Sequence, residues 1–67
     1  MNPKVGRYVR VTGFTPGHAL YLAEGIVEGY VDDAGGQLAQ VLLSHPRTSR
    51  GLLVHVQPAR LEVRRAR

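Results

Sequence analysis

The stretch LLVHVQPARLEV, residues 52–63, decides the fold of this chain. Its first six residues alternate: positions 52, 54 and 56 are apolar, and the other side carries Leu53, His55 and Gln57. An alternation of period two predicts a strand whose apolar side faces a core. Pro58 cannot donate to a strand ladder, so it ends this strand. The next residues, PAR, are long enough for one 3₁₀ turn, and LEV begins a last short strand.

A second strand is predicted near the start, in KVGRYVRVTG (residues 4–13). Valines at positions 5, 9 and 11 share one face, and Tyr8 and Arg10 lie on the other. The long loop TGFTPGHALYLAEG follows, with a turn at Pro16 and Gly17. Within it, HALYLAE is expected to form a helical turn or an irregular strand.

The middle of the chain reads as a hairpin. GIVEGYV (25–31) is predicted as a strand, and its two glycines favour a sharp bend or a bulge. QLAQVLL (37–43) is the partner strand, joined to it by DDAGG, where Gly35 and Gly36 can adopt positive φ. The loop SHPRTSRG then leads to residue 52.

These elements predict an all-β domain of about five short antiparallel strands over residues 1–63, followed by a basic tail at 64–67. With 67 residues and no cysteine, the core is small and has no disulfide to support it. Which side of the two hairpin strands, at 25–31 and 37–43, faces inward stays open. The expected core is Val5, Val9, Val11, Ile26 or Val27, Leu38 or Val41, Leu52, Val54, Val56, Leu61 and Val63.

The order of elements resembles that of small SH3-like barrels. The resemblance is carried by VGRYVRV, EGIVEGYV and VHVQPARLEV and covers almost the whole chain. It implies a barrel with a long first loop, a bent second strand and a 3₁₀ turn before the last strand. An OB-like barrel is the alternative fold, although it usually has longer strands and a helix. Barrels of this kind serve many functions, so the resemblance implies a fold more than an activity.

Within this group, the layout resembles the plasmid-borne type II dihydrofolate reductases, short barrels that form a tetramer around one pore. GRYVRV and GIVEGY match that family's first two strands in pattern. The family's active-site strand, Val-Gln-Ile-Tyr-Pro, corresponds to residues 54–58 here. Its glutamine is replaced by His55 and its tyrosine by Gln57, so the residues that would carry reductase activity differ.

Charge is concentrated at the carboxyl end. Residues 60–67 hold four arginines and one glutamate, whereas the rest of the chain has five basic and four acidic residues. Basic side chains neutralise phosphates and aromatic rings stack on unpaired bases, so nucleic acid is the first ligand class to consider. The candidate nucleic-acid-binding residues are Tyr8, Arg10, Arg47, Arg50, Arg64, Arg65 and Arg67. Eight arginines against one lysine is also the bias of a GC-rich bacterial genome.

Apolar residues occupy both faces of the strands at 37–43 and 52–57, although a barrel this small hides one face. The other face must be covered by the first loop or by another subunit, since large exposed apolar patches mark interfaces. The candidate interface residues are Leu43, Leu53, His55 and Gln57. Self-association or docking on a larger protein partner follows as an expectation.

Signals for chemistry are weak. The histidines at 18, 45 and 55 lack ligand spacing, and without cysteine no metal site is expected. Ser44 and His45 are neighbours without an orienting acid, so no catalytic residue and no cofactor are expected. The polar amino terminus and the absence of a 20-residue apolar run predict a cytoplasmic protein with no membrane partner.

The sequence therefore favours a non-enzymatic binding module, with nucleic acid as the leading ligand. A protein-interaction or assembly adaptor is the alternative, and a reductase-like pore enzyme is a more remote one.

Overall fold

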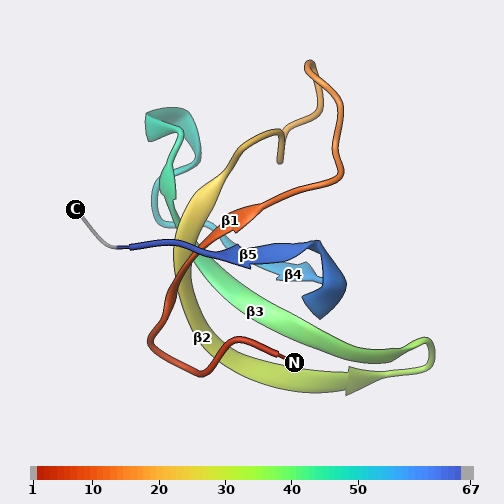
Figure 1. Ribbon diagram of the computed structural model, residues 1–67. Coiled ribbons are helices and arrows are strands. Elements are labelled where there is room, and N and C mark those ends of the chain that lie inside the picture. The colour runs from red at the N-terminus through yellow and green to blue at the C-terminus, as the bar shows by residue number, and fades with distance from the viewer. Residues whose placement is uncertain (1, 66–67) are drawn as a thin grey trace.

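Five antiparallel strands form one sheet in the order β4-β3-β2-β1-β5 (Figure 1). The computed structural model describes residues 2–65. The strands are β1 (Tyr8–Val11), β2 (Glu24–Asp33), β3 (Gly36–His45), β4 (Leu53–Val56) and β5 (Leu61–Val63), with 3₁₀ turns η1 (Arg47–Ser49) and η2 (Pro58–Arg60). The all-β class, the long first loop and the 3₁₀ turn before the last strand are confirmed.

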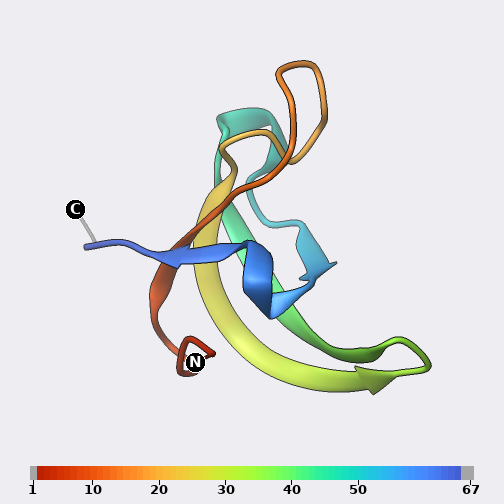
Figure 2. The ribbon, with the colours of Figure 1, turned by 45° about the vertical axis from the view of Figure 1, so that its right-hand side comes forward.

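β2 is long and bent, as its glycines predict. Its pairing with β3 shifts register between Glu24 and Gly25 and again between Val27 and Gly29. A Cβ atom at Gly25 would lie 2.1 Å from the carbonyl oxygen of Leu42, so only glycine lets β3 approach this closely. The bend turns the sheet strongly on itself, so that β2 pairs with β1 at one end and follows β3 along its length (Figure 2).

The curled sheet is not closed, which differs from the predicted barrel. β4 pairs with β3 and β5 pairs with β1, and no ladder joins β4 to β5 within residues 2–65. The short connection through η2 carries the chain from one edge strand to the other. Pro58 has no N–H to donate, and β5 spans three residues that pair with β1.

Among residues 2–65, eight buried apolar residues form the core on the inner side of the curled sheet. They are Val9, Val11, Ala23, Val27, Ala39, Val41, Leu43 and Val56. The undecided side of β3 is thereby settled, because Ala39, Val41 and Leu43 face inward while Leu38 and Leu42 face outward. The small Ala39 and the β-branched Val41 suit the inside of a tightly curled sheet, where the strands crowd together.

Three residues expected in the core are exposed instead. Val5 is 61% exposed because it lies in a turn before β1, where strand alternation does not apply. Leu52 is 55% exposed because β4 begins only at the next residue. Val63 is 44% exposed because it ends β5 at the open edge of the sheet. Val54 and Leu61, also expected inside, are partly buried against the core.

The first loop, residues 12–23, folds as successive turns rather than as a strand. Backbone N–H groups of His18 and Tyr21 donate to carbonyls three residues earlier. Arg60 holds the start of this loop: its Nη1 donates to the Gly13 carbonyl at 2.9 Å, and its guanidinium lies 4.6 Å from the centre of the Phe14 ring. The loop is thus attached to η2, next to the last strand.

Candidate functional site

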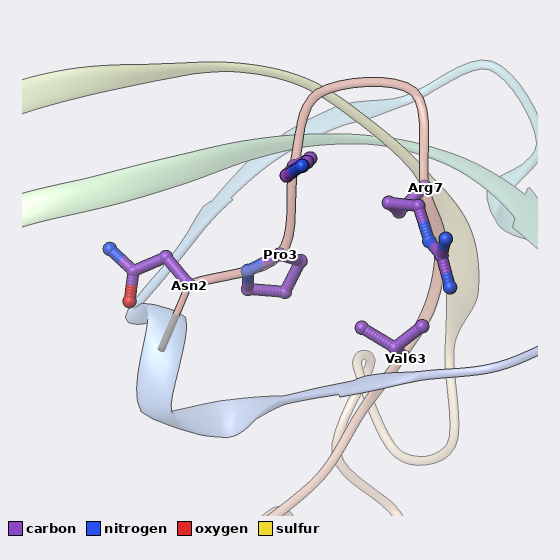
Figure 3. A pocket seen from close by; sticks show the side chains of 5 residues that line it. Asn2, Pro3, Arg7 and Val63 are labelled. Atoms are coloured by element: carbon purple, nitrogen blue, oxygen red, sulfur yellow. The ribbon is translucent and has the colours of Figure 1, made fainter.

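Two hollows meet at Arg7, at the end of the sheet where β1 and β5 run side by side. The first has a volume of about 270 Å³ and is lined by Asn2, Pro3, Lys4, Arg7 and Val63. Figure 3 shows Arg7 and Val63 on one side of this hollow and Asn2 and Pro3 on the other. The Tyr30 hydroxyl donates to the Pro3 carbonyl, which anchors the amino-terminal segment over β2.

The second hollow has a volume of about 360 Å³ and combines apolar and basic residues. It is lined by Gly6, Arg7, Tyr8, Ile26, Arg64 and Arg65. Tyr8 and Ile26 lie directly opposite each other in the β1–β2 register, and Ile26 is 41% exposed. The backbone N–H of Arg64 donates to the Tyr8 carbonyl at 2.8 Å, which fixes Arg64 beside the same strand.

A turn at residues 4–7 places Lys4 and Arg7 around these hollows. The Arg7 N–H donates to the Lys4 carbonyl at 3.1 Å, and the intervening Gly6 has a φ of 92°, a left-handed value that favours glycine. The Gly6 N–H donates to the Val27 carbonyl, and the Val27 N–H donates to Arg7. Both cations are therefore held by backbone hydrogen bonds that do not involve their side chains.

The lining of both hollows is basic. Lys4, Arg7, Arg64 and Arg65 contribute four cations, and no carboxylate lines either hollow among the described residues. Within residues 2–65, only Arg64 of these four pairs with a carboxylate, that of Glu62 at 3.4 Å. Both partners of that pair are well exposed, and exposed pairs contribute little to stability.

Beside the second hollow, Glu24 joins Tyr8 and Arg10 in a partly buried polar cluster. The Tyr8 hydroxyl donates to Glu24 Oε1 at 2.6 Å, and Arg10 Nε donates to Oε2 at 2.9 Å. The hydrogen bond from Tyr8, assisted by Arg10, holds the pKa of Glu24 below its usual value, although burial opposes this. The cluster fixes the Tyr8 ring and neutralises the charge of Arg10.

An exposed apolar row crosses the outer face of the sheet next to this cluster. Ile26 lies opposite Leu42, and Leu42 lies opposite Leu53 on β4. These side chains are 41%, 39% and 51% exposed, respectively. Three neighbouring exposed aliphatic residues on adjacent strands form a continuous apolar strip.

The sequence-predicted nucleic-acid residues separate into groups. Tyr8, Arg64 and Arg65 line the second hollow together. Arg10 lies on the same strand as Tyr8 but is paired with Glu24. Arg47 and Arg50 belong to the η1 loop, which projects at the end of the sheet near the first loop, away from the amino-terminal turn (Figures 1 and 2). The seventh candidate, at position 67, lies outside the described residues.

The predicted interface residues are also divided. Leu43 is 2% exposed and packs in the core, so it cannot contribute to an outer surface as expected. Leu53 is exposed in the apolar strip, and Gln57 is exposed after β4. His55 is exposed beside Gln40, with 3.4 Å between the side-chain nitrogens. Ile26 and Leu42 are the strip residues that the sequence analysis did not identify as an interface.

Lys4 and Arg7 are the site residues that sequence reasoning missed. Their signal is the short segment PKVGR, in which a glycine between two cations indicates a turn that gathers them. What connects this turn to Arg64 is the pairing of β1 with β5, which is long-range and has no local signature.

Few residues in the described part of the chain are candidates for metal binding or catalysis. No group of three or more potential metal ligands is found there. His18 stacks on Phe14 at 4.2 Å between ring centres, His45 lies opposite Glu24 on β3, and His55 is near Gln40. Nor does any helix in residues 2–65 have the length and apolar character needed to cross a membrane.

No family model, curated protein or solved structure matches the chain.

Proposed function

We propose that this protein is a non-enzymatic nucleic-acid-binding module whose site is the pair of basic hollows. One observation carries the proposal: four cations surround two adjoining hollows that no carboxylate of the described residues lines. Such an arrangement attracts phosphates, because neutralising each one releases counterions from the nucleic acid. The strand order and the bent β2 also support our proposal that the fold is related to SH3-like barrels.

The site differs in part from the one expected from the sequence. Arg10 is excluded as a phosphate ligand because its guanidinium is already bound to Glu24 at 2.8 Å. Moving it to a phosphate would leave a carboxylate that is 8% exposed without its cationic partner. Arg7 replaces it as the central cation, since it lines both hollows and has no carboxylate partner within residues 2–65.

The test is fluorescence anisotropy with labelled single-stranded RNA and duplex DNA. The double variant Arg7→Gln/Arg65→Gln removes two phosphate contacts from exposed side chains. Counterion release predicts a loss of about 25-fold in affinity for single strands at about 0.1 M salt. The matched control is Arg47→Gln/Arg50→Gln, which removes the same charge from the η1 loop and should leave affinity nearly unchanged. Equal losses in both variants would show a diffuse charge effect and contradict the assigned site.

Self-association is a second candidate function, favoured by the apolar strip of Ile26, Leu42 and Leu53. It is an alternative to nucleic-acid binding at this face, because a second copy over Ile26 would cover the second hollow. We propose a second copy of this chain as its occupant, because Leu42 and Leu53 lie side by side on neighbouring strands and a two-fold axis can pair this strip with itself. A chain with only eight buried apolar residues among those described also gains much from covering this strip.

Light scattering tests this second candidate. We expect a dimer whose mass changes little with salt, and we expect a monomer for Leu42→Gln/Leu53→Gln. A monomeric wild-type protein at all concentrations would exclude the second copy as the occupant.

A further inference from the structure

We infer that the site binds single-stranded nucleic acid, with an unpaired base against Tyr8 and Ile26 and the adjoining phosphates on Arg7, Arg64 and Arg65. This inference rests on the proposed function and adds the class of nucleic acid. Its starting point is the mixed character of the second hollow, which has a tyrosine and an isoleucine side by side within a rim of three arginines.

The apolar part of the hollow distinguishes a base from a phosphate. Ile26 is 41% exposed and lies directly opposite Tyr8 on the neighbouring strand. A phosphate group makes no favourable contact with an aliphatic side chain, whereas the face of an unstacked base does. In a duplex the base faces are stacked inside the helix, so a duplex would meet the arginines and place no base face in the apolar part of the hollow.

The hydrogen bond with Glu24 holds the Tyr8 side chain in place for contact with a base. The Tyr8 hydroxyl is held by Glu24 at 2.6 Å, and Glu24 is held in turn by Arg10. A ring whose position is already fixed loses little side-chain entropy when a base packs on it. Because the Tyr8 hydroxyl donates to Glu24, Tyr8 would contribute to binding through the contact area of its ring and not through hydrogen bonds to base edges. Binding should therefore tolerate different base sequences, as stacking on aromatic residues generally does.

The two hollows also provide a path for the sugar-phosphate backbone of the bound strand. They share Arg7, and Lys4 lines the first one. A strand whose base contacts Tyr8 can thus continue past Arg7 with its next phosphate near Lys4. The first hollow also contains Pro3 and Val63, so a second apolar surface lies beside that continuation.

The experiment compares three labelled probes at one salt concentration: a single strand, its duplex, and the same strand with abasic residues. The abasic probe keeps the phosphates and removes the bases, so it tests stacking without altering the protein. We expect the single strand to bind about tenfold more tightly than the abasic strand, the range of one stacked base, and more tightly than the duplex.

The second part of the experiment measures the binding of protein variants to the same probes. Tyr8→Ala should lower affinity for the single strand about tenfold and for the abasic strand little. Tyr8→Phe keeps the ring and should restore most of that loss. The matched control is Tyr21→Ala, which removes an exposed tyrosine of the first loop and should bind like the wild type.

The outcomes separate this inference from the proposed function. A duplex or an abasic strand that binds as tightly as the single strand overturns the single-strand inference and leaves nucleic-acid binding intact. Absence of binding to all three probes at low salt overturns the proposed function and this inference with it.

Discussion

The salt dependence of binding is the sharpest test of the site, because its magnitude follows from the number of cations around the hollows. Lys4, Arg7, Arg64 and Arg65 can each neutralise one phosphate. For a single strand, four contacts give a slope of about −2.8 in a plot of log affinity against log salt. Affinity should then fall about 50-fold between about 50 and 200 mM salt. Any contact from residues outside 2–65 would make this slope steeper.

The change in slope on mutation is independent of such extra contacts. Replacing Arg7 and Arg65 by glutamine removes two phosphate contacts, so the slope should become shallower by about 1.4. If the four described cations are the only contacts, the loss over the same salt range falls to about 7-fold. The assay is an anisotropy titration at four or five salt concentrations for each variant. A slope that is unchanged in this variant, or equally reduced by replacing Arg47 and Arg50, would refute the assignment of phosphates to the hollows.

Three further predictions concern the fold that supports the site, each checked by urea unfolding. Leu43→Ala should lower the free energy of unfolding by about 2–5 kcal/mol, since Leu43 is 2% exposed. Leu52→Ala, which is 55% exposed and lies outside the apolar strip, should change it by no more than about 0.5 kcal/mol. Equal effects would contradict the placement of Leu43 in the core. Gly25→Ala should lower the free energy of unfolding by at least about 1–3 kcal/mol, because the added methyl group would meet the backbone of β3. The control is Gly35→Ala, because a methyl group at Gly35 would meet open space. Glu24 has a folded pKa below its unfolded one, so its contribution is complete above about pH 4.3 and is lost as the pH falls through the folded pKa. Glu24→Gln should flatten this acid dependence, and an acid limb as steep as that of the wild type would count against the cluster.

The strands were predictable from local patterns, and the exceptions have physical causes. Alternation identified β1, β4 and β5 because one face of each is apolar. It could not decide the parity of β3, whose two faces are both apolar, since that depends on the long-range pairing of β3 with β2 and β4. It placed Val5 in the core because nothing in the alternation indicated that the chain turns at Gly6. Closure of the sheet likewise depends on long-range pairing between edge strands.

The candidate site was predictable only in part, for a related reason. Tyr8 and Arg64 stood out as an aromatic and a basic residue, but their adjacency comes from the β1–β5 pairing. Arg10 was expected to bind phosphate because its partner, Glu24, is fourteen positions away and is brought opposite by the β1–β2 register. The composition gives the number of charged residues, whereas strand pairing determines which of them already have a partner of opposite charge in the fold.

The distribution of the remaining acidic residues defines where a bound strand can go. Glu28, Asp32 and Asp33 are exposed on β2, the latter two at the hairpin end. Asn2, at the edge of the first hollow, donates to Gln37, which pairs with Asp32 in the hairpin. A phosphate moving beyond Asn2 would therefore approach carboxylates and be repelled. The favourable path is bounded on that side, and it runs from the first hollow past Arg7 to Tyr8 and Arg64.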